Sequence, residues 1–342
     1  MPPAAALDRP HILVLPTPSL YRRLVSPDND RRLRALGVVT FNEHERNPTS
    51  AELAGRIDGF DVVVTGWGSP RFTDDVLAAA RPRVKLVVHS AGSIKFMLPD
   101  HALERFRVST AAAAMAPVVG EFGLLLTLLS LRPVHKLDRA MHAGVDWRNI
   151  KTTTTGDELA GQRIGVIGAG NTGRAYIRLV RALGVETWAY DPYLTDARAA
   201  ELDVKRVATL DELLRECSII SLQAPSTPET HHMIGRRELG LMPDGARLIN
   251  TARSWLIDGD ALLAELKTGR ISAALDVYDE EPLPADHPLR SLDNVILTPH
   301  VASATPQCHF RQGQITSDEV ERFLRGESLR HEVTPQMLAI MA

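Results

Sequence analysis

The stretch Arg163 to Gly173, RIGVIGAGNTG, decides the fold that we expect for this chain. Its first residues form an apolar run typical of a buried strand, and the residues after Gly173, RAYIRLVRALG, have helical periodicity. Three glycines lie between them in the spacing G-x-G-x-x-G, which is the context that dinucleotide binding requires. Gly168 permits the tight turn, and Gly170 lets a pyrophosphate approach the backbone. A plain strand–helix turn is the alternative interpretation.

The rest of the glycine loop and the next strand end support a nicotinamide cofactor. Asn171 and Thr172 complete the loop, and the free N–H groups at the start of the helix would bind the anion. Asp191 ends the next expected strand, 18 residues after Gly173. A carboxylate there can accept both hydroxyls of an adenosine ribose and would repel a 2′-phosphate, so we expect NAD rather than NADP. A helix-capping or turn aspartate before Pro192 is the alternative.

The same alternation of short apolar runs and helical periods extends along the chain and indicates parallel βαβ units in two regions. We expect strands at residues 11–15, 61–66, 84–90, 163–168, 186–191, 203–207, 217–223, 246–250, 272–277 and 294–298. Their continuous apolar character suits strands that helices cover on both faces. A helix over 118–132 is apolar nearly all round, so we expect it to be covered on all sides, between domains or at a subunit interface. A long helix over 305–325 is expected to return to the first region.

Bulk properties exclude several classes of protein. The chain has 342 residues, which favours about two domains, and 44% of them are hydrophobic. The net charge of −3 gives no reason to expect nucleic-acid or membrane binding. The two cysteines, Cys217 and Cys308, belong to no metal-binding spacing, so we expect reduced thiols and no metal site. The N-terminus lacks a basic region, and the longest apolar run, residues 122–131, is too short to span a bilayer, so a cytoplasmic location is expected.

Because ligands of a doubly wound sheet bind beyond the carboxyl ends of its strands, the residues after each strand form one set. Ala224 and Pro225 begin a stiff loop that ends near Thr230 and could face the cofactor, although a plain loop is equally compatible. Thr251-Ala252-Arg253 follow the next strand, and the planar fork of an arginine matches a carboxylate in two parallel hydrogen bonds. A surface arginine in a salt bridge is the alternative for Arg253.

The last two strands deliver Asp276 and His300, with the acidic loop YDEEPLP between them. Taken alone, the loop is typical of a solvated acidic loop. His300, taken alone, is one of the 12 histidines of the chain and has no special role. Together with the glycine loop and Arg253, they suit hydride transfer to a carbonyl next to a carboxylate.

Six motifs then occur in the order found in the D-isomer-specific 2-hydroxyacid dehydrogenases, which the sequence resembles. These motifs are GVIGAGNTGRAYIRLVRALG, AYDPY, PSTPETHHMIG, LINTAR, ALDVYDEEPLP and NVILTPHVASAT. The resemblance implies an α/β fold of two Rossmann-like doubly wound domains. Residues 117–304 would form the NAD-binding domain, inserted into a flavodoxin-like catalytic domain made of residues 1–116 and 305–342.

The resemblance also implies roles for individual residues. Arg253 would bind the substrate carboxylate, His300 would be the acid/base, and Glu281 would be the carboxylate paired with it. Asp276 would lie near the nicotinamide ring, with Thr251 and Ala252. The substrate-binding set would be Ala91, Gly92 and Ser93 in the loop that receives the carboxylate, together with Arg253 and His300.

The expected activity is therefore NAD-dependent interconversion of a 2-oxo acid and a D-2-hydroxy acid, by a homodimer. Two alternatives stay open: an NAD(H)-sensing regulatory protein on the same fold, and a phosphite-type dehydrogenase. The sequence departs from the family at Ser254, where a glycine is usual, and at Gly120, where an alanine is usual. These departures leave the substrate undecided.

Overall fold

A computed structural model describes residues 9–153, 155–339 and 341. The chain divides into two compact units, Met1–Met115 with Ala304–Ala342, and Ala116–Ser303. Both divisions lie one residue before the boundaries expected from the sequence.

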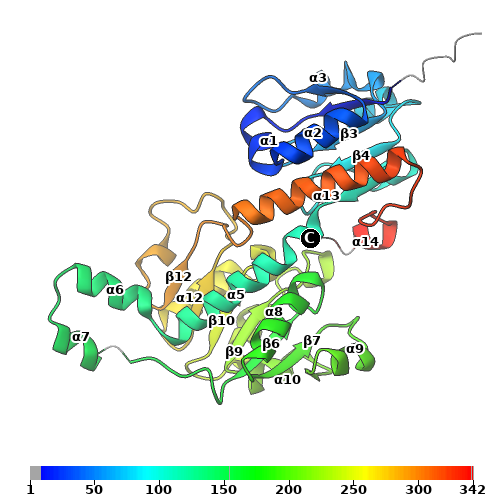
Figure 1. The fold of residues 1–342 in the computed structure, drawn as a ribbon. Coiled ribbons are helices and arrows are strands. Elements are labelled where there is room, and N and C mark those ends of the chain that lie inside the picture. Colours follow the sequence, from blue (N-terminus) through cyan, green and yellow to red (C-terminus); the bar gives the residue numbers. More distant parts are fainter. Residues whose placement is uncertain (1–8, 154, 340, 342) are drawn as a thin grey trace, which may run out of the picture. The chain divides into compact units, whose positions relative to one another are not determined.

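The first unit is built on a five-stranded parallel sheet with the order β2-β1-β3-β4-β5. Figure 1 labels its strands β3 and β4. The strands are β1 (His11–Val14), β2 (Val38–Phe41), β3 (Val62–Thr65), β4 (Leu86–His89) and β5 (Arg107–Thr110). The helices are α1 (Pro18–Leu24), α2 (Pro27–Leu36), α3 (Ser50–Ala54), α4 (Asp74–Ala79), α13 (Pro306–Leu324) and α14 (Pro335–Ala339), with 3₁₀ turns at Ile57–Gly59, Asp100–Glu104 and Ala112–Ala114. The chain crosses from β1 to β2 on one side and to β3 on the other. The carboxyl ends of β1 and β3 therefore flank a topological switch point.

Helix α13 comes from the far end of the sequence and packs on α1, α2 and β4 of the first unit (Figure 1). Thr305 caps its N-terminus, which fixes where the helix begins. Arg32 of α2 donates to Asp318 and Glu321 of α13 at 2.8 and 2.6 Å. The long helix expected over 305–325 is therefore present, and it belongs to the first unit.

The second unit contains a seven-stranded parallel sheet with the order β12-β11-β10-β9-β6-β7-β8. The strands are β6 (Arg163–Ile167), β7 (Glu186–Tyr190), β8 (Lys205–Arg206), β9 (Ile219–Leu222), β10 (Arg247–Asn250), β11 (Ser272–Leu275) and β12 (Val295–Leu297). The helices are α5 (Ala116–Leu131), α6 (Val134–His142), α7 (Trp147–Thr153), α8 (Asn171–Ala182), α9 (Asp196–Glu201), α10 (Leu210–Glu216), α11 (Arg236–Leu241) and α12 (Gly259–Lys267), with 3₁₀ turns at Pro228–Thr230, Ser254–Leu256 and Pro288–Ser291. The strand order reverses between β6 and β9, so the expected ligand crevice lies at the carboxyl ends of these two strands.

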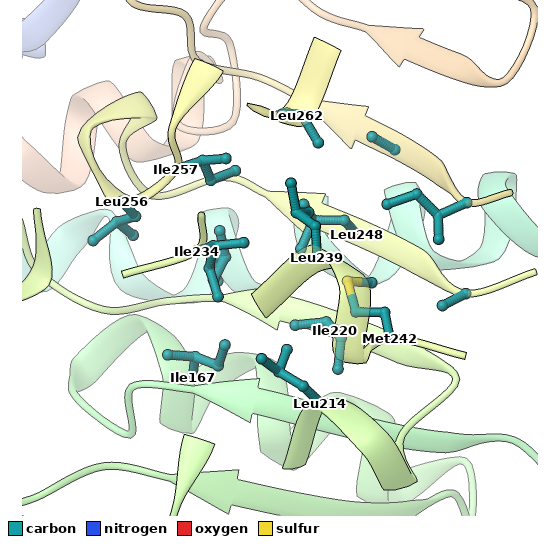
Figure 2. Packing of buried hydrophobic residues seen from close by; sticks show 14 of the residues in the cluster. Ile167, Leu214, Ile220, Ile234, Leu239, Met242, Leu248, Leu256, Ile257 and Leu262 are labelled. Atoms are coloured by element: carbon teal, nitrogen blue, oxygen red, sulfur yellow. The ribbon is translucent and has the colours of Figure 1, made fainter. Parts of the chain in front are cut away.

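Aliphatic side chains from strands and helices form the main core of the second unit. Figure 2 shows Ile167, Ile220 and Leu248 of β6, β9 and β10 with Leu214, Ile234, Leu239, Met242, Leu256, Ile257 and Leu262 from the helices and loops over them. Burial of each such side chain contributes about 1.5–3 kcal/mol. This core holds the strand ends that carry the candidate site.

Helix α5 meets only part of the expectation for an apolar helix. By length and composition alone, Ala112–Leu131 could cross a membrane, a criterion that core helices also meet. The helix packs on α8 so closely that a Cβ at Gly120 would lie 2.8 Å from the backbone nitrogen of Tyr176, which explains the glycine there. Leu125 and Leu128 are nevertheless 46% and 37% exposed, so the described part of this chain does not cover the helix on every side.

Two strands, β2 and β5, were not expected from the sequence, and β8 is shorter than the strand expected over 203–207. Strand β2 lies at the sheet edge, and none of its residues is buried. Strand β5 has the sequence RVST, in which one aliphatic residue gives no hydrophobic run. The β-branched and aromatic residues of β2, VVTF, do favour a strand. Strand β5 becomes a strand because β4 pairs with it, and a local pattern does not record that pairing.

Candidate functional site

The glycine loop between β6 and α8 has the shape that a dinucleotide requires. Gly168 has φ +96°, and a Cβ there would lie 2.6 Å from the backbone nitrogen of Ala224. A Cβ at Gly173 would lie 2.0 Å from the carbonyl oxygen of Gly168, so the helix start packs directly on the turn. A Cβ at Gly170 would meet nothing within 4 Å, and no side chain caps the N-terminus of α8. The space above Gly170 and the N–H groups of the helix start therefore fit a pyrophosphate.

Two other loop residues from the sequence prediction lie at the start of α8. Asn171 is exposed, and its side-chain oxygen accepts from Arg174 at 2.6 Å. Thr172 is half-buried. Their contacts with a cofactor stay predictions.

Asp191 follows β7 and joins its carboxylate to the glycine loop. One oxygen accepts from the Ala169 N–H at 2.7 Å, and the other accepts from the Tyr193 N–H at 2.8 Å. The carboxylate is thus fixed beside the loop with lone pairs remaining for a ribose. Its negative charge at this position disfavours a 2′-phosphate.

The loop after β9 is fixed by internal hydrogen bonds. Ala224 is buried against Gly168, and Pro225 is half-buried. The Thr230 hydroxyl donates to the Pro225 carbonyl at 2.7 Å and accepts from the Thr227 N–H at 2.9 Å. Thr230 therefore shapes the loop wall, and its contact with a cofactor stays a prediction.

Arg253 is positioned by a turn that follows β10. The buried Asn250 side chain donates to the Arg253 carbonyl at 2.9 Å and accepts from the Ala252 N–H at 3.0 Å. The side chain of Arg253 donates to the Ala252 carbonyl at 2.6 Å. Burial lowers the pKa of the Arg253 guanidinium, and the charge of Glu281 offsets part of that effect. An arginine remains charged in proteins, so Arg253 contributes a fixed positive charge at the carboxyl end of β10.

Thr251, beside this turn, is buried and accepts from the Gln223 side-chain amide at 3.2 Å. Ala252 is half-buried. Both lie at the carboxyl end of β10, and the glycine loop lies at the carboxyl end of β6 in the same sheet. Their cofactor contacts stay predictions.

His300 and Glu281 form a pair. Nδ1 of His300 lies 2.8 Å from Oε2 of Glu281, and the other carboxylate oxygen, Oε1, accepts from the Tyr278 N–H at 3.0 Å. The His300 side chain is 46% exposed, and within the described chain its Nε2 has no hydrogen-bond partner. A histidine held at Nδ1 by a carboxylate and free at Nε2 can exchange a proton with a ligand.

Asp276, directly after β11, is fully buried. Its Oδ1 accepts from the Thr298 hydroxyl at 2.6 Å and from the Val301 N–H at 2.9 Å, and its Oδ2 accepts from the Ala302 N–H at 2.9 Å. The position near the nicotinamide ring that the resemblance implies for Asp276 stays a prediction. The structure adds a role within the protein, because all three donors belong to the loop that carries His300.

The predicted substrate loop lies in the first unit, directly after β4. Ala91 is buried and Ser93 is half-buried, and Gly92 packs against Met115. The backbone N–H groups of Ala91, Gly92 and Ser93 donate to no acceptor in the described part of the chain. Three free N–H groups in succession form a backbone environment that suits a carboxylate.

Three residues that support the site were missed: Asn250, Tyr278 and Thr298. Asn250 could have been found, because an asparagine at a strand end commonly forms a turn with its own side chain. Tyr278 and Thr298 act through contacts between separate strands, so local sequence carries no signal for them.

Known proteins resemble the chain over this same region and beyond. Residues 124–302 match the family described as "D-isomer specific 2-hydroxyacid dehydrogenase, NAD binding domain". D-3-phosphoglycerate dehydrogenase of Methanocaldococcus jannaschii is 35% identical over 306 residues, which cover 89% of this chain and 57% of that protein. Glyoxylate reductase of Korarchaeum cryptofilum is 31% identical over 310 residues, which cover 87% of this chain and 92% of that protein.

Among solved structures, D-mandelate dehydrogenase of Rhodotorula graminis superposes with a TM-score of 0.84 at 25% identity, covering 95% of this chain and 98% of that one. The doubly wound fold, the glycine loop with Asp191 and these similarities agree. The chain belongs to the D-isomer specific 2-hydroxyacid dehydrogenase family and has an NAD-binding domain.

Proposed function

We propose that the protein reduces a 2-oxo acid to a D-2-hydroxy acid with NADH, and catalyses the reverse reaction with NAD. In this proposal His300 is the acid/base, Glu281 is its paired carboxylate, and Arg253 binds the substrate carboxylate. The observation that carries the proposal is the 2.8 Å contact between Nδ1 of His300 and Glu281, which leaves Nε2 free. His300 follows β12 and the glycine loop follows β6, so both lie at the carboxyl ends of strands in the same parallel sheet.

The charges of the chain suit this reaction. A bound NADH would supply the hydride, and the residues of the chain would act on the negative charge that grows on the carbonyl oxygen of the substrate. His300 would donate a proton from Nε2 to that oxygen while Glu281 holds the ring through Nδ1. Arg253 would stabilise the growing negative charge as well as hold the carboxylate. In the reverse direction a neutral His300 would accept the proton.

The free amides of Ala91, Gly92 and Ser93 support a second anion contact. We propose that they bind a carboxylate within the first unit, as successive backbone N–H groups do in other anion sites. This loop has no role in holding the cofactor in our proposal.

We also propose that the protein is a homodimer formed through α5, α6 and α7. Helix α6 has no buried residue, although Val134 and Met141 are large and apolar, and Trp147 of α7 is 59% exposed. Leu125 of α5 adds to this set of exposed apolar side chains. Exposed apolar side chains gathered on consecutive helices are typical of a protein interface.

A substrate panel tests the proposed activity. Oxidation of NADH and of NADPH would be followed with glyoxylate, hydroxypyruvate, 3-phosphohydroxypyruvate and phenylglyoxylate, and reduction of NAD with phosphite. We expect turnover with at least one 2-oxo acid and a kcat/KM at least tenfold higher with NADH than with NADPH, because of Asp191.

The other outcomes separate the alternatives. NADH binding by fluorescence without turnover of any compound would support an NAD(H)-sensing protein. Turnover of phosphite alone would support the phosphite-type activity. Equal kcat/KM with both cofactors would contradict the role of Asp191.

A further inference from the structure

The backbone of His300 is held from both sides by one buried side chain. Asp276 accepts from the Thr298 hydroxyl, two residues before His300, and from the N–H groups of Val301 and Ala302, which directly follow it. The three distances are 2.6, 2.9 and 2.9 Å, and Asp276 has no exposed surface. A carboxylate in such surroundings forms strong hydrogen bonds, because water does not compete for them.

His300 needs this support because its backbone conformation is unfavourable. Its φ is +53°, in the left-handed region that residues with a Cβ rarely adopt. Such a conformation costs on the order of 1–3 kcal/mol and persists only where surrounding contacts fix it. The bonds from Asp276 close the turn on either side of this one residue.

The donors leave little choice of side chain at position 276. Each carboxylate oxygen of Asp276 accepts from a backbone N–H, Oδ1 from Val301 and Oδ2 from Ala302, so the side chain at this position needs two acceptor oxygens. An asparagine would present one oxygen and one NH₂ group, and the NH₂ group would face at least one N–H. The hydrogen bond from Thr298 to Asp276 depends on the hydroxyl, because valine has nearly the same shape without the donor.

Tyr278 links the two members of the catalytic pair to this arrangement. Its hydroxyl lies 2.8 Å from the Thr298 carbonyl, and its N–H donates to Glu281 at 3.0 Å. Burial raises the pKa of Tyr278 to about 12, so the hydroxyl keeps its proton and can donate. Thr298 is therefore fixed at its hydroxyl and at its carbonyl, and the residue that holds the carbonyl also orients Glu281.

We propose that Asp276 and Thr298 are positioning residues that hold the His300 backbone in its left-handed conformation and so direct the imidazole. This inference rests on the proposed function for its catalytic consequence and goes beyond it, because it assigns the buried carboxylate to the histidine loop. A displacement of about 1 Å in a catalytic group can reduce the rate about 100-fold.

The first experiment compares Thr298→Val with Thr298→Ser, because neither change touches Asp276 itself. We expect Thr298→Val to lower kcat about tenfold and to move the pH profile of kcat, and Thr298→Ser to restore both. The dissociation constant of NADH, measured by fluorescence, should change less than threefold in either variant. Equal behaviour of the two variants would overturn the proposal, because only valine removes the donor.

The second experiment separates the histidine loop from the cofactor. We expect Asp276→Asn to lower kcat about 100-fold with less than a threefold change in NADH affinity. A loss of NADH affinity as large as the loss of kcat would assign Asp276 to the cofactor instead. Thr268→Val is the matched control, because the Thr268 hydroxyl is also hydrogen-bonded but lies after α12, before the amino end of β11.

Hydrogen exchange provides a readout that needs no turnover. We expect the amides of Val301 and Ala302 to exchange at least tenfold faster in Asp276→Asn, with unchanged exchange in the glycine loop. Unchanged exchange at Val301 and Ala302 would overturn the proposal even in an active enzyme. Faster exchange in a protein that turns over no 2-oxo acid would leave the loop assignment standing and would reject the proposed function alone.

Discussion

Two histidines, His89 and His300, lie at or just beyond strand carboxyl ends in the two units, and their surroundings differ in every respect that governs proton transfer. His300 is 46% exposed and faces Glu281 at 2.8 Å. His89 has no exposed surface, and its Nδ1 lies 2.9 Å from the Thr65 hydroxyl. Burial lowers the pKa of His89 to about 4, so its imidazole is neutral at pH 7.

The difference shows that position at a strand end does not make a histidine an acid. A carboxylate neighbour favours the imidazolium, whereas burial beside a hydroxyl favours the neutral ring. His300 also has a free Nε2 near the surface, while the Nε2 of His89 is buried and has no partner in the described chain. The predictions below begin with the change that should separate the two histidines most.

Replacing His300 should have the largest effect. We expect His300→Gln to lower kcat for 2-oxo acid reduction about 1,000-fold, because general acid catalysis contributes about 10²–10⁴-fold. NADH affinity should stay within about twofold, since His300 holds no part of the glycine loop. Steady-state kinetics and a fluorescence titration check this prediction. A parallel loss of affinity and turnover would contradict an acid role.

Replacing the neighbour of His300 should have a smaller effect of a particular kind. Glu281→Gln keeps a hydrogen-bond acceptor for Nδ1 of His300 but removes the negative charge beside it. We expect kcat for reduction to fall about tenfold while NADH affinity stays within about twofold, measured by steady-state kinetics and a fluorescence titration. An unchanged kcat would contradict a role for the charge of Glu281.

The third prediction concerns His89 and the stability of the protein in acid. Because the pKa of His89 is lowered in the folded state to about 4, the unfolded chain binds more protons between pH 6.5 and 4. The free energy of unfolding should therefore fall as the pH falls through this window, with His89 contributing a loss of about 3 kcal/mol between pH 7 and 4. Urea unfolding at several pH values should give a shallower decline for His89→Gln than for the native chain.

Two variants control this measurement. His142→Gln should leave the slope unchanged, because the His142 side chain is 83% exposed. Phe96 packs edge-on against His89 with ring centroids 6.0 Å apart and is itself 54% exposed. Phe96→Ala should therefore admit water toward the imidazole and reduce the acid slope by a smaller amount. A steeper slope in Phe96→Ala would contradict burial as the cause.

Much of the fold and part of the site were predictable from the sequence. The glycines of the motif around Gly168 are predictable, because a Cβ at Gly168 or Gly173 would collide with backbone atoms. Strands β6, β9 and β10 are continuous apolar runs, and periodicity therefore finds them. Strand β5 escaped because pairing with β4, rather than local composition, makes it a strand.

The supporting residues of the site escaped for a similar reason. Asp276 was expected at the cofactor, and nothing in ALDVY predicts that three donors from residues 298–302 would surround it. Tyr278 and Thr298 belong to separate segments, and only their 2.8 Å contact gives them a shared role. The left-handed backbone of His300 is equally invisible in TPH, because the conformation is imposed from outside the tripeptide.

The sequence by itself determined the parallel βαβ plan, the glycine loop and the acidic residue after β7, because each depends on spacing and side-chain chemistry within a short segment. The resemblance to the family implied the arginine, the glutamate and the histidine of the proposed reaction. Only the tertiary structure decided that His89 is buried and neutral and that a buried carboxylate, Asp276, bonds to the His300 loop. Burial and hydrogen bonding between distant segments set those properties, and both arise only when the strands lie side by side.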